Sequence, residues 1–166
     1  MNRLVRSALA CVALAMLSGC GFVIVHGVRH AYVAYTTKQE NEINAALARY
    51  RTLTLRMQPE KVAAMFDLNG EVSHESQDPV IGREAILAFV NSFVGYKILE
   101  YELTATSTAV QGESATQKGT YRQKVIAPTG ETVAVQGTFE ARWSRQTGSW
   151  LISRMHTVSA PINDGG

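Results

Sequence analysis

The feature that most constrains the fold is a stretch near the C-terminal end whose side chains alternate between two classes. Over residues 132–144, every second position is apolar or small: Val133, Val135, Gly137, Phe139, Ala141 and Trp143. The positions between them are polar or charged, with the exception of Ala134. Successive side chains of a β-strand point to opposite faces. This period therefore predicts a strand that has one face on a core and the other in solvent.

Three other segments, residues 97–106, 114–126 and 150–158, have the Thr, Val, Tyr and Trp content of strands. Turn residues at 127–130 and 146–148 predict hairpins between the last three strands. The first half of the chain is different. It predicts an amphipathic helix over residues 39–57, a short helix that begins at Pro59, and a third helix with an apolar stripe from Ile86 to Phe93. Asn69-Gly70 predicts a turn before a short strand at 71–75. Helices followed by hairpin-linked strands favour the α+β class.

Size and charge narrow the class of protein. The chain has 166 residues, of which 46% are hydrophobic and 18% charged, which fits one globular domain with an appendage. The net charge of +2 is small, and no stripe of Lys and Arg is interleaved with aromatic residues. No nucleic-acid partner is therefore expected.

The N-terminus has the pattern of an export signal. Arg3 and Arg6 precede a short apolar run, which is followed by Leu17-Ser18-Gly19-Cys20. That tetrapeptide resembles the lipobox of bacterial lipoproteins. The resemblance implies that residues 1–19 are a cleaved signal peptide and that Cys20 carries the lipid, with residues 20–38 as a connector. Two or three acyl chains would anchor the protein stably. Gly21 would then direct it to the outer membrane of a Gram-negative host.

An uncleaved anchor is the alternative. No residue from 7 to 28 is formally charged, and the apolar run continues past Cys20 through residues 21–25. Its length suits a membrane-spanning helix, and the positive flank would leave the domain outside the cytoplasm. Both readings predict a membrane-anchored, extracytoplasmic protein of the cell envelope. Cys11 and Cys20 are the chain's two cysteines, so neither a disulfide nor thiol chemistry is expected in the domain.

The order of elements over residues 42–159 resembles the NTF2-like superfamily, and in particular its SnoaL-like members. The cues are the segment 66–72, the helix start Gly82-Arg83-Glu84-Ala85-Ile86, and the hairpin between Trp143 and Trp150. The resemblance implies a domain over residues 39–160, with 161–166 as a tail. It implies three N-terminal helices packed on a curved antiparallel sheet, a cone-shaped pocket, and a homodimer formed through the outer sheet face. The superfamily contains enzymes as well as binding modules, so fold alone does not assign a reaction.

The resemblance suggests two catalytic candidates. Tyr50 falls where the steroid-isomerase branch keeps a tyrosine that donates to a developing oxyanion. His74 falls where that branch has its aspartate base, and an imidazole can also move protons near neutral pH. Phe139 falls where the branch has a second acidic donor, so ketosteroid isomerisation in particular is not expected.

Other side chains are predicted to line the pocket: Phe89, Phe139, Trp143, Arg154 and His156. Trp150, Ile152, Arg154 and His156 share one face of a regular strand, so Arg154 and His156 would follow the tryptophan towards the mouth of the pocket. The strand around Tyr121 shows no clean alternation, and Tyr121 is assigned to the surface. His74 and His156 lack a third ligand at suitable spacing, so no metal and no cofactor are expected.

Three functions remain open at this point. The first is binding of a small apolar molecule in the pocket. The second is a proton-transfer enzyme (an isomerase, dehydratase or cyclase) that uses His74 and Tyr50. The third is a non-catalytic assembly module of the envelope, in which the cone would be filled.

Overall fold

The computed structural model describes residues 33–161. The predictions for residues 1–19, for Cys20 and for most of the tail lie outside this range. The chain divides into two compact units, residues 1–39 and 40–166. The described part of the first unit is helical, and that helix extends over residues 33–55. Within residues 33–161, no helix has both the length and the apolar character needed to cross a membrane.

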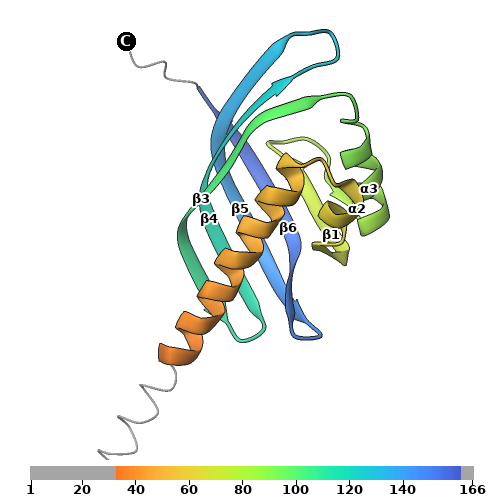
Figure 1. The fold of residues 1–166 in the computed structure, drawn as a ribbon. Helices are drawn as coiled ribbons and strands as arrows, with labels where there is room; N and C mark the ends of the chain where they lie inside the picture. The colour runs from red at the N-terminus through yellow and green to blue at the C-terminus, as the bar shows by residue number, and fades with distance from the viewer. Residues whose placement is uncertain (1–32, 162–166) are drawn as a thin grey trace, which may run out of the picture. The chain divides into compact units, whose positions relative to one another are not determined.

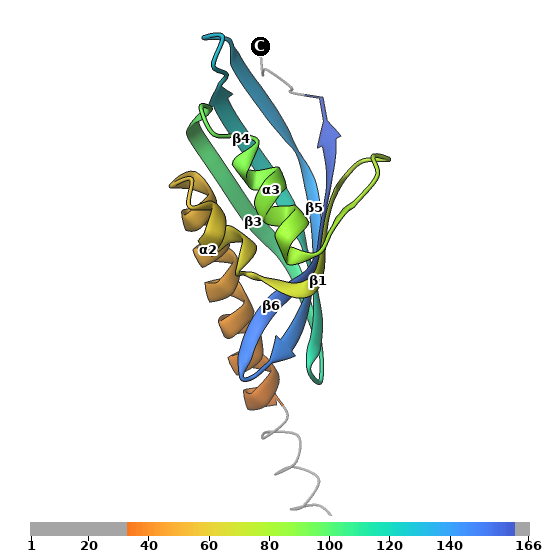
Figure 2. The same cartoon turned by 90° about the vertical axis from the view of Figure 1, so that its right-hand side faces the viewer.

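Over its described residues, 40–161, the second unit contains two further helices and six strands. The helices are α2 (Pro59–Ala63) and α3 (Arg83–Asn91). The strands are β1 (Phe66–His74), β2 (Val80–Ile81), β3 (Lys97–Gln111), β4 (Ser114–Ile126), β5 (Thr132–Gln146) and β6 (Ser149–Ala160). They form one curved sheet in the order β2-β1-β6-β5-β4-β3 (Figure 1). Residues 40–55, α2 and α3 lie on its inner side (Figure 2).

The prediction of an entirely antiparallel sheet is wrong, because β1 runs parallel to β6. The remaining pairs are antiparallel, so the sheet is mixed. The three helices also do not form one N-terminal group. Helix α2 is only five residues long, and α3 follows β1 and β2 in the chain. The long connection through β3, β4 and β5 brings β6 back beside β1, a pairing that no local pattern reveals.

The strand prediction for residues 114–126 is confirmed, and the other long strands extend further than predicted. The turn predicted at Asn69-Gly70 is wrong, because both residues lie within β1. A register shift between Phe66 and Glu71 accommodates them. A Cβ atom on Gly70 would lie 2.8 Å from the Phe66 Cβ and 3.1 Å from the Ile152 carbonyl oxygen. This glycine therefore permits close packing rather than a chain reversal.

The core lies between the inner sheet face and the helices. Ile43, Leu47 and Leu53 of the long helix are buried against it, together with Phe66 and Ile86. The inward face predicted for residues 132–144 is largely confirmed, since Gly137, Phe139, Ala141 and Trp143 are buried. Val133, at the start of β5, is the exception and is 39% exposed.

Two groups of polar contacts hold the helices in place. The Trp150 indole N–H donates to Glu42 Oε2 at 3.3 Å, and Arg145 Nη2 lies 3.2 Å from the same oxygen. At the start of β1, Arg83 Nε donates to the Phe66 carbonyl at 3.0 Å. Gly82, at a φ of 93°, donates its N–H to the Gly70 carbonyl at 2.8 Å. The Gly82-Arg83 motif thus attaches α3 to β1.

The middle of the sheet contains two reciprocal pairs of a glycine with an aromatic residue. Gly119 lies opposite Phe139, and Tyr121 lies opposite Gly137, across β4 and β5. A Cβ on Gly119 would lie 2.1 Å from the Thr104 carbonyl oxygen, and one on Gly137 would lie 1.9 Å from the Val158 carbonyl oxygen. Neighbouring backbone thus occupies the space that a side chain would need. Glycines placed this way allow a sheet to bend, and aromatic rings cover the gaps they leave.

The substitution Gly137→Ala is predicted to destabilise the domain by about 1–3 kcal/mol, because the new methyl group must push β6 away from β5. Urea denaturation followed by circular dichroism measures the loss. Thr138→Ala is the matched control, since Thr138 is exposed on the outer face of the same strand, and it should cost less than about 1 kcal/mol. Equal stability of the two variants would contradict the steric role of Gly137.

Candidate ligand-binding pocket

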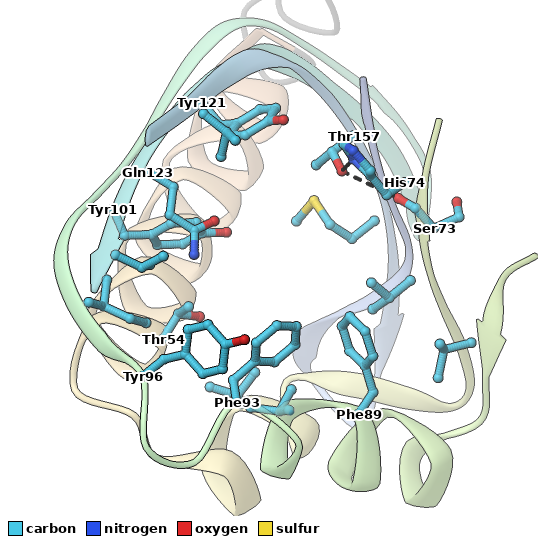
Figure 3. Close-up of a pocket in the computed structure, with 18 of the residues that line it drawn as sticks. Thr54, Ser73, His74, Phe89, Phe93, Tyr96, Tyr101, Tyr121, Gln123 and Thr157 are labelled. Atoms are coloured by element: carbon cyan, nitrogen blue, oxygen red, sulfur yellow. Dashed lines mark hydrogen bonds between the residues drawn. The ribbon is translucent and has the colours of Figure 1, made fainter. Parts of the chain in front are cut away.

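A cavity of about 450 Å³ lies between the inner sheet face, α3 and the C-terminal part of the long helix. Figure 3 shows its walls. Tyr101, Tyr121 and Gln123, from β3 and β4, form one side. His74 and Thr157, from β1 and β6, form the opposite side. Phe89 of α3 lies between the two sides, together with Phe93 and Tyr96 from the segment just after the helix.

Aromatic rings dominate the lining. Four of the chain's six tyrosines line the cavity, together with two phenylalanines. Phe89 and Phe93 pack edge to face with ring centroids 5.1 Å apart, and Phe93 and Tyr96 do the same at 5.7 Å. Phe89 is nevertheless 38% exposed and Phe93 39% exposed. Their rings therefore present apolar surface to the hollow that the protein itself does not cover.

The lining carries almost no charge. Asp78, at the rim, is its only carboxylate, His74 is its only other titratable group besides the tyrosines, and no lysine or arginine lines the cavity. Over residues 33–161, no cluster of three His, Cys, Asp or Glu side chains is placed to hold a metal ion. An anionic ligand would have to leave water without gaining an opposite charge, which is costly.

Tyr50 lines the cavity, as predicted, but it is packed tightly. Its ring meets Phe66 at 5.9 Å and Tyr101 at 6.4 Å, both edge on. Burial raises the pKa of the Tyr50 phenol, although its hydrogen bond with Tyr101 opposes the shift. Burial raises the pKa of Tyr101 well above its usual value, and the neighbouring Tyr50 raises it further. Both groups are therefore neutral hydrogen-bonding phenols at physiological pH.

His74 also lines the cavity, and both of its ring nitrogens have partners. Nδ1 lies 2.9 Å from Thr157 Oγ1, and Nε2 lies 3.3 Å from Ser159 Oγ. Nε2 is also 3.6 Å from Glu75 Oε1. A neutral imidazole has one donor and one acceptor, so these hydroxyls can satisfy it in either tautomer. The ring is thereby held against the β6 wall of the pocket.

Four residues that were predicted to line the pocket do not line it. Phe139 and Trp143 are buried in the core, and neither lines the cavity. Arg154 and His156 lie on the outer face of the sheet, because Ser153 is an extra residue between the pairs Arg142–Arg154 and Trp143–Ile152. This β-bulge reverses the alternation that the sequence implied.

The reversal changes which side chains reach the cavity. After the bulge, Met155, Thr157 and Ser159 line it. On the outer face, Arg154 Nε lies 2.9 Å from Glu71 Oε1, and His156 Nδ1 lies 2.9 Å from Ser73 Oγ. Phe89 is in the wall, where the sequence placed it.

Two residues of the β4 wall were missed from sequence. Tyr121 is buried and lines the cavity, where the sequence suggested a surface position, and Gln123 follows it on the same face. The inward face of β4 begins Ala115, Gln117, Gly119, so polar and small residues occupy buried positions. The hydrophobic alternation that marks an inward face is therefore hidden in this strand.

A curved mixed sheet wrapped around an aromatic hollow is the NTF2-like architecture. The sequence profile of the SnoaL-like domain family matches residues 36–156, and the chain belongs to this family. Among curated proteins, none matches the sequence.

Solved structures agree with the fold. A protein of unknown function from Mycobacterium tuberculosis has a TM-score of 0.70 at 19% identity, covering 79% of this chain and 77% of its own. A ketosteroid isomerase-like protein from Erwinia carotovora has a TM-score of 0.65 at 17% identity, covering 73% and 96%. An NTF2-like protein with a cystatin-like fold from Novosphingobium aromaticivorans has a TM-score of 0.65 at 19% identity, covering 82% and 89%.

Tyr101→Phe is predicted to flatten the loss of stability in alkaline solution. An unfolded tyrosine ionises near pH 10, while the folded Tyr101 stays protonated because its pKa is raised. The contribution of Tyr101 to the free energy of unfolding is therefore present below that pH and is lost as the pH rises through the folded pKa. Unfolding free energies of wild type and variant, measured between about pH 8 and 11, test this. Below about pH 8 their difference should be constant. If the unfolding free energies of the two proteins changed in parallel over the whole pH range, Tyr101 would not have the raised pKa that its burial implies.

Proposed function

We propose that this domain binds a neutral, mostly apolar small molecule in the cavity. The observation that supports this most directly is the pair of half-exposed rings, Phe89 and Phe93, which face an open hollow. Pockets for small molecules typically enclose about 300–1,000 Å³ and combine apolar walls with a few polar groups. The cavity of about 450 Å³ falls in that range. The lack of lysine and arginine in its lining favours an uncharged ligand.

The neutral fluorescent probe N-phenyl-1-naphthylamine tests this proposal. The purified full chain is expected to bind it with increased fluorescence, read against a protein-free blank in the same detergent. Phe93→Ala should weaken binding about tenfold, equivalent to about 1.4 kcal/mol, because one apolar wall is removed.

Leu99→Ala is the matched control. Leu99 is 45% exposed, similar to Phe93, but does not line the cavity, so this variant should bind as wild type does. Absence of probe binding by wild type, or equal binding by the Phe93 and control variants, would exclude the cavity as the binding site.

A proton-transfer enzyme is the second candidate, because His74 and Tyr50 line the same cavity. Tyr50, kept neutral by its raised pKa, could donate to an oxyanion. His74 would first have to release a hydroxyl partner to act as a base, since Thr157 and Ser159 engage both its nitrogens. This requirement makes ligand binding the better-supported function. An assembly module with a filled cone is less well supported, because the cone contains a cavity. A homodimer through the outer sheet face is still a proposal.

We also propose that the domain is tethered outside the cytoplasm by its N-terminus, in the outer membrane if the host is Gram-negative. The support is the sequence around Cys20 alone. In a bacterial host, wild type is expected to incorporate radiolabelled palmitate and to fractionate with membranes. Cys20→Ser should abolish the label, while Cys11→Ser, within the same apolar segment, should keep it. Membrane fractionation without label in wild type would indicate an uncleaved anchor instead, and a soluble, unlabelled wild type would exclude both.

A further inference from the structure

Gln123 is the polar side chain of the cavity's sheet wall whose hydrogen-bonding groups the protein leaves free. Gln77 and Tyr96 also line the cavity without a side-chain hydrogen bond to any described residue, but both lie outside the strands. Gln123 lies on the inner face of β4 and is half-buried, and its side chain reaches the cavity beside Tyr101 (Figure 3). No partner for its amide exists anywhere in residues 33–161. Its cross-strand neighbours on the same face are Tyr101 and Val135, which offer it an aromatic ring and an aliphatic side chain.

Most of the other polar groups on the sheet walls of the cavity are engaged with each other. His74 contacts Thr157 and Ser159, and the Tyr121 hydroxyl lies 3.3 Å from Ser159 Oγ. The Tyr50 and Tyr101 phenols share a hydrogen bond. These groups orient one another, and a ligand would have to break an existing contact to use them fully.

Gln117 provides a comparison, because it is a buried glutamine on the same face of β4. It precedes Gln123 along the inner side of β4 and is fully buried. Its amide nitrogen donates to Asn44 Oδ1 at 2.8 Å and to Thr108 Oγ1 at 3.1 Å, while its Oε1 is buried without a partner. The N–H donors of this buried amide are thus paired within the protein, as polar groups in an interior normally are. An amide that faces a hollow without such partners is placed to pair with whatever fills the hollow.

We propose that Gln123 is the residue that selects and orients the ligand, by pairing its amide with a neutral group that both accepts and donates hydrogen bonds. A carboxamide or lactam meets this requirement, because a primary amide presents one carbonyl acceptor and two N–H donors. A carboxylate meets it poorly, since it only accepts and the lining offers no cation. This inference rests on the proposed function and adds the chemical class of the ligand's polar group.

The experiment compares two probes of the same shape. In 2-isopropenylnaphthalene, a methylene and a methyl group replace the oxygen and nitrogen of 2-naphthamide. Each displaces N-phenyl-1-naphthylamine from the full chain, and the ratio of their Kd values cancels the shared naphthalene contribution. Gln123→Met keeps the length of the side chain and removes its hydrogen bonds. This substitution should raise the ratio of the 2-naphthamide Kd to the 2-isopropenylnaphthalene Kd about tenfold, as expected for loss of a paired hydrogen bond.

Gln136→Met is the matched control. Gln136 lies on the adjacent strand, and its amide donates to the Pro161 carbonyl at 2.8 Å, so its side chain does not line the cavity. It should leave the ratio as in wild type. An unchanged ratio in Gln123→Met, or an equal shift in the control, would overturn the role of Gln123.

A measurement on wild type alone covers the case in which Gln123→Met does not fold. Wild type should bind 2-naphthamide at least about tenfold more tightly than 2-naphthoate, because the carboxylate gains no cation. Equal binding would overturn the inference while leaving the pocket itself intact. If the fluorescent probe does not bind wild type at all, the proposed function fails and the role of Gln123 fails with it.

Discussion

The hollow in this domain depends on a steric constraint in the middle of the sheet. Gly119 and Gly137 leave no room for a Cβ atom, because carbonyl oxygens of the neighbouring strands occupy that space. Phe139 and Tyr121 face these two glycines across the strands and cover them. The sheet can therefore bend around the helices while its inner surface stays closed. A flat sheet would pack against the helices directly and leave less space between them.

A second local irregularity decides the chemistry of that space. Because Ser153 is an extra residue in β6, the alternation of side chains between the two sheet faces is reversed after it. Trp150 and Ile152 point to the core, and Arg154 points to the outer face, where it pairs with Glu71. Without the bulge, a guanidinium and an imidazole would enter the pocket. With it, a thioether and two hydroxyls do, which makes the cavity nearly uncharged and favours a neutral ligand.

Much of the architecture was predictable, because long amphipathic segments report their own period. The strand at 114–126, the α2 start at Pro59, the helix that presents Phe89 and the inward face around Ala141 follow from residue order. The pocket was less predictable. Arg154 was assigned to the wrong face because a one-residue bulge leaves no compositional mark. Gln123 was overlooked because a glutamine at an inward position resembles a surface residue until its surroundings are known.

The sequence by itself determined the class of fold, the two layers and the family, since these depend on periodicities and motifs that are local along the chain. It also contains the N-terminal pattern on which membrane attachment is proposed. Only the tertiary structure decided that β1 pairs in parallel with β6, that the cone is hollow, and which polar groups face that hollow without a partner. These properties depend on contacts between residues far apart in the chain. Local patterns constrain such contacts but do not specify them.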